Sequence, residues 1–428
     1  TNTCPMAPFR GVSRPVMTFA IERLIDTAAI ELDISPVEIR RRNLVSEFPY
    51  TTATGVPFDS GSYVETLDEA ERHIDVEAFR TRQAEARKQG RYLGLGFAVF
   101  NERSGFGTPV FAQRMMDITL GYETVEMAMD PSGNVEARIG ASPHGQGLKT
   151  ALSQVIADEL GLAPDAIRII SGDTDRTPYG WGTFASRSMV IAGGACKLAA
   201  QGLRDKITRV AARQLQTEAG EVKLVDGAAR IGETGASVAM SEIARAAYHS
   251  SHLFKDDIEN GLTATATYDP AGTFSNACHA VIVEVDIETG EVAIERYLSV
   301  EDAGRIINPM IAEGQVHGGI TQGIANALLE EIVYDEDGNI LTATLADFLV
   351  PTSAEIPEIE IHHLETINDA SITGAKGLGE GGTIGAPSAV VNAIADALSP
   401  IAAAPYEMPT TPRKIRELIR AGKGTAHD

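Results

Sequence analysis

One carboxylate stands in an unusually glycine-rich stretch near the end of the sequence. Glu380 follows Gly377 and Gly379 and precedes two more glycines. Glycines let a backbone approach a bound group closely, and a carboxylate in a partly desolvated cleft has a raised pKa and can accept a proton near neutral pH. The residues alone leave two interpretations open, a general base at a binding site and a solvated Glu in a flexible connector. A phosphate loop is disfavoured, because Lys376 is followed by glycine rather than Ser or Thr.

Three further segments combine glycine or small residues with polar side chains. They are Arg10; Gly145, Gln146 and Gly147; and Ala185, Ser186, Arg187 and Ser188. An amide side chain before a helix can bind an oxo or phosphate group, and clustered hydroxyls beside a guanidinium suit an anion. Taken singly, these segments are also explained as a surface charge, a tight turn and a helix N-cap.

The four segments, in this order, resemble the large subunit of the molybdenum hydroxylases, a family that includes xanthine dehydrogenase, aldehyde oxidoreductase, aerobic carbon monoxide dehydrogenase and N-heteroaromatic dehydrogenases. The resemblance runs from Phe9 almost to the end and includes residues 312–319 and 406–412. It implies that Glu380 is the catalytic base and that Arg10 helps to bind substrate and stabilises its developing negative charge. The cofactor-binding residues that it implies are Gly145, Gln146, Gly147, Ala185, Ser186, Arg187, Ser188, Gln315, Gly377 and Gly379.

The resemblance also implies a molybdenum–pterin cofactor in its cytosine dinucleotide form, whose metal is held by the pterin and not by protein side chains. Water would supply the oxygen, and electrons would leave through iron–sulfur clusters and FAD on partner subunits. Phe184 and Phe106 would line the substrate pocket. We expect an N-heteroaromatic substrate, nicotinate- or purine-like, with an aldehyde oxidoreductase as the alternative. The intact set of Glu380, Gln146 and Ser186 argues against a catalytically silent assembly subunit or a nucleotide-binding module.

Two departures from the family pattern refine these expectations. Copper-type carbon monoxide dehydrogenases have Cys directly after the Arg10 position, where this chain has Gly11, so copper-dependent chemistry is not expected. The family's Gly-Gly-Phe-Gly loop is matched only by residues 104–107, which lack the first glycine. With Thr1 in place of Met, we expect a split subunit or a processed fragment. Such a chain would need a second molybdopterin-binding polypeptide, an iron–sulfur subunit and a flavin subunit.

Regular elements must position these segments. A helix entered at Pro15 carries apolar residues at helical spacing to about residue 32, and Ser35 with Glu38 forms a capping box at the next helix. Hairpins at 125–139 and 281–298 each lead to a helix. This order predicts a weak internal repeat, an α+β fold of two related mixed α/β domains. We place their boundary near residue 260, as units 1–260 and 261–428.

Composition limits the function. The 428 residues carry a net charge of −23 with a pI near 4.8, which disfavours nucleic acid as a partner. No run of about 18 apolar residues is present, so no membrane association is expected. Three scattered cysteines are too few for an iron–sulfur or structural zinc site and favour reduced thiols in the cytoplasm.

Overall fold

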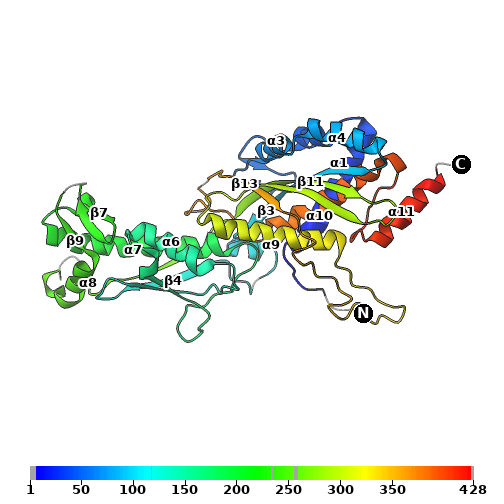
Figure 1. Cartoon of the computed structure of the whole chain (residues 1–428). Helices are drawn as coiled ribbons and strands as arrows, with labels where there is room; N and C mark the ends of the chain where they lie inside the picture. The colour runs from blue at the N-terminus through cyan, green and yellow to red at the C-terminus, as the bar shows by residue number, and fades with distance from the viewer. Residues whose placement is uncertain (1–5, 117, 233–234, 255–258, 368, 426–428) are drawn as a thin grey trace.

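The computed structural model describes residues 6–425 except 117, 233–234, 255–258 and 368. Two lobes lie side by side, and each is built around a four-stranded mixed sheet (Figure 1). The fold is α+β, as the sequence predicted.

The first lobe holds β4 (Glu123–Met129), β5 (Val135–Ile139), β6 (Ile167–Ile170) and β10 (Thr263–Tyr268), with α5 (Thr108–Gln113), α6 (Leu148–Leu160) and α7 (Ser188–Leu215). A three-stranded sheet extends this lobe, formed by β7 (Val222–Val225), β8 (Ala228–Ile231) and β9 (Ser237–Ala239) and followed by α8 (Met240–His249). The Asp-Gly pair at 226–227 forms the turn that joins β7 to β8.

The second lobe holds β3 (Tyr92–Ser104), β11 (Thr273–Val285), β12 (Val292–Asp302) and β13 (Ile359–Leu364), with α9 (Pro309–Leu328), α10 (Gly381–Leu398) and α11 (Pro412–Thr425). The chain before β3 also packs here, as α1 (Arg14–Leu32), α2 (Pro36–Asn43), α3 (Tyr63–Ile74) and α4 (Val76–Lys88), with a short pairing of β1 (Tyr50–Thr51) and β2 (Pro57–Phe58). Helices α9 and α10 cover one face of the sheet, and α3 and α4 cover the other.

The two sheets share one arrangement, as the internal repeat predicted. Their strand orders are β10-β4-β5-β6 and β3-β11-β12-β13, and in both only the last pair is parallel. In the first lobe α7 packs on β10 and β4 with α6 beside it, and in the second α10 packs on β3 and β11 with α9 beside it. The hairpin, the parallel strand and the two helices therefore recur in the same order.

The predicted division at residue 260 needs a correction, because the edge strands are exchanged between the units. β3 precedes β4 in the chain yet pairs with β11, from Thr273↔Ser104 to Val285↔Tyr92. β10 precedes β11 yet pairs with β4 in the first lobe. The first hundred or so residues thus belong to the second lobe, and the unit 1–260 is not one packed body. Sequence order could not show this, since strand pairing joins residues far apart in the chain.

Helix α10 lies directly on the backbone of β3. A Cβ built on Gly96 would stand 2.2 Å from the carbonyl oxygen of Ala389 and 2.2 Å from the amide nitrogen of Ala393. Only glycine permits this approach, because a side chain would overlap the helix backbone. α10 is also the one helix of the described chain long and apolar enough to cross a membrane, and most of it is buried in the core. It begins at Gly381, directly after Glu380.

Helix α1 has the predicted bounds, but its charged face packs against the protein and its apolar face points outward. Its buried residues include Glu22, Arg23 and Asp26, whereas Leu24 is 68% exposed. The inner charges meet Arg40, which is 1% exposed and donates to Glu22 Oε2 from Nε at 2.7 Å and lies 2.8 Å from Asp26 Oδ1. Burial of charge is tolerated here because the charges are paired and hydrogen-bonded. The apolar face of α1 is left outward.

Two local predictions were incomplete. Ser35 accepts a hydrogen bond from the amide of Glu38 at 3.0 Å, but the Glu38 carboxylate binds Arg41 and Arg42 instead of reaching back, so only half of the capping box forms. The capping box requires both bonds. Helix α3 was also not predicted from the sequence.

We predict that Gly96→Ala destabilises the second lobe by roughly 3 kcal/mol, because the new methyl group must displace α10. Thermal unfolding should show a lower midpoint. Gly220→Ala is the matched control, since a Cβ there would meet nothing within 4 Å. An equal midpoint for the two variants would contradict the direct contact.

Candidate functional site

The N-termini of four helices meet in pairs between the lobes. A Cβ on Gly147, the residue before α6, would lie 2.7 Å from Cδ1 of Ile311 in the first turn of α9. A Cβ on Gly379, just before α10, would lie 3.3 Å from Oγ of Ser186, just before α7. Helix N-termini expose unpaired N–H groups and carry a partial positive charge. The region between the lobes is therefore suited to a bound anionic group.

The glycine-rich loop is held tightly against the turn that precedes α7. The amide of Gly377 donates to Oγ of Ser104, at the end of β3, over 2.9 Å. A Cβ on Gly377 would stand 2.4 Å from the carbonyl oxygen of Ser186, so no larger residue fits. Ala185 and Ser186 both have left-handed backbone conformations, with φ of 50° and 48°. Strain of this kind in non-glycine residues is often found at functional sites.

Arg10 fastens the glycine-rich loop to α9. Its Nε donates to the carbonyl oxygen of Gly379 at 2.5 Å, and a terminal nitrogen donates to the carbonyl oxygen of Gln315 at 2.9 Å. The other terminal nitrogen donates to Oε1 of Gln322 at 3.2 Å. Gln322, which lies two helical turns after Gln315, was not predicted as a site residue. The structure thus engages every nitrogen of the guanidinium with protein acceptors.

Gln146 joins two of the predicted segments. Its Oε1 accepts the amide of His144 at 2.8 Å, and its Nε2 donates to Oγ1 of Thr183 at 3.5 Å. Thr183 also shares a hydrogen bond with Oγ of Ser188, at 2.7 Å. The segments 145–147 and 185–188 are therefore neighbours in space, as the sequence grouped them.

Arg187, in contrast, braces the first lobe. Its side chain is buried, donates to the carbonyl oxygen of Gly121 at 3.3 Å and lies 4.7 Å from the ring of Phe184. Burial lowers its pKa to about 10. Phe184 contacts Phe111, which packs edge-on against the buried Phe106, so the two expected pocket residues belong to one aromatic cluster.

Glu380 lies at the N-terminus of α10 with only 13% of its side chain exposed. Burial raises its pKa, against the opposing effects of Arg14, the backbone amide of Ala185 and Arg10. The terminal nitrogen Nη1 of Arg14 lies 3.5 Å from Oε2 of Glu380. Within the described residues this oxygen accepts no hydrogen bond. Glu380 is thus a carboxylate that is held in place, partly desolvated and still able to accept a proton.

A second carboxyl group, missed by the sequence analysis, lies close to Glu380. Glu102 is fully buried on β3, and neither of its oxygens has a hydrogen-bond partner among the described residues. Burial and the charge of Glu380 raise its pKa to about 8, despite the opposing charge of Arg14. The buried setting of Glu102 therefore favours its protonated form. An acidic residue at an inward position of an otherwise apolar strand was the available signal.

Comparison with known proteins identifies the family. The sequence profile of the molybdopterin cofactor-binding domain matches residues 69–357 and, in a second part, residues 1–44. The chain belongs to the molybdenum hydroxylases. The large subunit of nicotine 6-hydroxylase from Paenarthrobacter nicotinovorans is 44% identical over 99% of the chain and 52% of the relative. The carbon monoxide dehydrogenase large chain of Hydrogenophaga pseudoflava is 35% identical over 94% of the chain and 50% of the relative.

A solved structure agrees with these sequence relatives. Quinoline 2-oxidoreductase from Pseudomonas putida 86 superposes with a TM-score of 0.93 at 39% identity, covering 97% of this chain and 53% of that one. The molybdenum hydroxylase chain thus spans about half the length of the relatives it matches.

The residues between the lobes fit a molybdopterin cofactor. Polar atoms that are buried without a hydrogen-bond partner, in the part of the chain that is described, gather there: Oγ of Ser186, Oε2 of Glu380 and both oxygens of Glu102. A Cβ on Gly145 or Gly182 would meet nothing within 4 Å, so the loops leave room beside them. Paired helix N-termini supply donors for phosphate oxygens.

We predict that Glu102→Gln flattens the pH dependence of stability. Because folding raises the pKa of Glu102, its native state binds the extra proton, and stability is lost as pH rises from about 5 through about 8. A neutral Gln avoids this loss, which is on the order of 3 kcal/mol. Thermal unfolding at pH 5.5 and 8.5 measures it.

The exposed Glu242, changed to Gln, is the control and should keep the pH dependence of the unmodified protein. The same pH dependence in Glu102→Gln would show that Glu102 titrates normally.

Proposed function

We propose that this chain is the molybdopterin-binding part of a hydroxylase that introduces oxygen from water into an N-heteroaromatic ring. The observation that carries the proposal is the partly desolvated, positioned Glu380 at the N-terminus of α10, one of the four helix N-termini that meet in pairs between the lobes. The substrate class rests on two relatives, named nicotine 6-hydroxylase and quinoline 2-oxidoreductase.

In this proposal the cofactor is held by the loops already described. Backbone and side chains of Gly145, Gln146, Gly147, Ala185, Ser186, Ser188, Gln315, Gly377 and Gly379 would contact the pterin, its phosphates and the molybdenum ligands. When bound, the cofactor supplies two-electron redox chemistry at molybdenum. We propose its cytosine dinucleotide form.

Glu380 would act as the general base. Its raised pKa brings proton affinity nearer to neutral pH, and the ion pair with Arg14 keeps the carboxylate ionised and oriented before it takes a proton. Arg10 would serve as a positioning residue, since its nitrogens hold the carbonyl oxygen of Gly379 and α9 rather than a substrate. Burial and the charge of Glu380 favour the protonated form of Glu102, which would leave the negative charge of the pair on Glu380.

We further propose that a second molybdopterin-binding polypeptide covers the outer face of α1. Val16, Met17, Ile21 and Leu24 are at least half exposed and fall on one side of the helix. An exposed apolar stripe of this kind marks an interaction surface. An iron–sulfur subunit and an FAD subunit would receive the electrons. The buried free thiols of Cys196 and Cys278 suit a cytoplasmic complex, and Cys4 lies outside the described residues.

We predict that Glu380→Gln lowers turnover of an N-heteroaromatic substrate by a factor of about 10² to 10⁴, because the amide cannot accept the proton. Molybdenum and pterin content should stay near that of the unmodified complex. Glu313→Gln, on the exposed side of α9, is the control and should keep full turnover. Turnover by Glu380→Gln within a factor of two would remove Glu380 from this role.

We also predict that Leu24→Glu weakens assembly with the molybdopterin-binding partner at least tenfold, because a charge would be buried in the interface. The measurement is the fraction of chain that elutes with its partner in size-exclusion chromatography. Leu253→Glu changes an equally exposed leucine in the first lobe and should leave assembly unaffected. If Leu24→Glu assembles normally, α1 is not the docking surface.

A further inference from the structure

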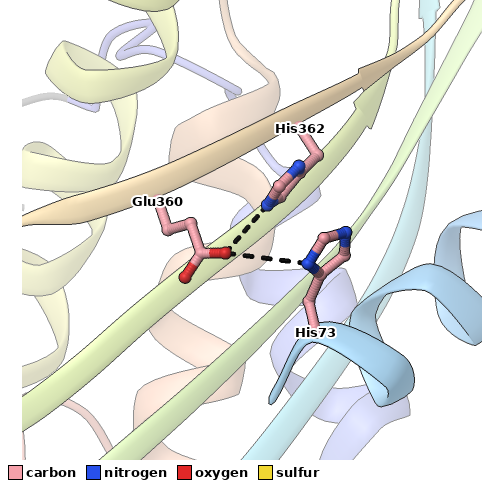
Figure 2. Close-up of side chains that lie close together, drawn as sticks. All are labelled: His73, Glu360 and His362. Carbon is pink, nitrogen blue, oxygen red and sulfur yellow. Dashed lines mark hydrogen bonds and ion pairs between the residues drawn. The ribbon is translucent and has the colours of Figure 1, made fainter. Parts of the chain in front are cut away.

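Two histidines and a glutamate converge where α3 meets the edge strand β13 (Figure 2). Nε2 of His362 lies 2.8 Å from Oε1 of Glu360, and Nδ1 of His73 lies 3.8 Å from the same oxygen. The two imidazole rings are 3.7 Å apart at their centroids. All three candidate ligand atoms fall within 4.8 Å of one another.

These separations suit a small divalent cation. Zn²⁺ binds imidazole nitrogen and carboxylate oxygen at about 2.0–2.2 Å, which places the ligand atoms of a tetrahedral site about 3.3 Å apart. The two measured distances lie on either side of this value, so small side-chain rotations are enough. Glu360 and His362 are two residues apart on one face of β13, and His73 lies in the last turn of α3. Regular elements therefore fix all three positions.

Neighbouring side chains orient these ligands. The terminal nitrogen Nη2 of Arg296 lies 2.7 Å from Oε2 of Glu360 and forms an ion pair with it. The other oxygen, Oε1, therefore faces the histidines. Nε2 of His73 lies 3.4 Å from Oε2 of Glu69, one helical turn earlier. Nε2 also lies 2.8 Å from Nη2 of Arg72, which can only donate a hydrogen bond. Metal binding therefore requires Arg72 to turn away, so that Glu69 accepts the Nε2 proton and the lone pair of Nδ1 faces Glu360.

The surface beside this group is acidic. A hollow of about 620 Å³ lies between α3 and the end of β13. Its acidic lining residues are Glu65, Asp68, Glu69 and Glu365, and the described residues that line it include no Lys or Arg. Glu69 belongs both to this lining and to the surroundings of His73. Asp68 is paired with Arg41 and Glu69 with Arg72, so Glu65 and Glu365 supply most of the negative charge that raises the local concentration of cations.

From this geometry we propose that His73, Glu360 and His362 form a binding site for Zn²⁺, with water as the fourth ligand. The ligand side chains are each 23–36% exposed, which leaves an entry path. The site is separate from the region between the lobes, because it lies on the sheet face covered by α3, whereas Glu380 precedes α10 on the opposite face. It does not depend on the proposed hydroxylase activity. A cation here would link α3 to β13 and so brace the edge of the second sheet.

The test is titration of the purified, chelator-treated chain with Zn²⁺ alone, followed by isothermal calorimetry, and with Co²⁺, whose visible absorption reports tetrahedral coordination. We expect one equivalent to bind and the thermal unfolding midpoint to rise. His362→Ala and His73→Ala should each weaken binding at least tenfold. Glu69→Gln should weaken it about tenfold, as outer-shell substitutions commonly do.

His252→Ala, an exposed histidine in the first lobe, is the matched control and should bind Zn²⁺ like the unmodified chain. Unfolding midpoints measured without metal establish that each variant is folded. Unchanged stoichiometry and affinity in His73→Ala and His362→Ala would overturn the proposal. It would equally be overturned if the unmodified chain bound no stoichiometric Zn²⁺, which would leave the three residues as an ion pair only.

Discussion

The pairing of β3 with β11 is the constraint on which the rest of the structure depends. It spans all 13 residues of each strand and brings the N-terminal hundred residues into the second lobe. Each functional contact of β3 follows from this register. The backbone of α10 packs directly on Gly96, Glu102 is buried near Glu380, and Oγ of Ser104 accepts a hydrogen bond from the amide of Gly377. One strand therefore sets both the packing of α10 and the place of the loop before it.

The exchange of β3 and β10 also explains why the site lies between the lobes. Each unit carries two helices whose N-termini face the other unit, so that α6 meets α9 and α7 meets α10. Interlocked strands connect the two pairs, and the converging helix dipoles add to the positive charge of Arg10 and Arg14. This reconciles an anion-binding site with a chain of net charge −23.

Buried charge is distributed in two different ways in the second lobe. Beneath α1, Glu22 and Arg40 neutralise each other through hydrogen bonds, which makes the network structural. Around the glycine-rich loop, Glu102 and Glu380 are both acidic and incompletely hydrogen-bonded. Burial raises the pKa of both groups, and the charge of Glu380 raises that of Glu102 further. Buried carboxyl groups without hydrogen-bond partners destabilise the folded state. They are the pattern expected where a structure is suited to proton transfer.

Local signals in the sequence determined much of this protein. Pro15 set the start of α1, the alternation of apolar and polar residues set the hairpins, and the order of short motifs identified the family. Those features depend on neighbouring residues and on motif chemistry. Tertiary structure alone decided the exchange of β3, the inward face of α1 and the partners of Arg10. Glu380 was recognisable as a carboxylate among glycines, but its desolvation and its neighbour Glu102 arise from contacts between residues hundreds of positions apart, which no local pattern encodes.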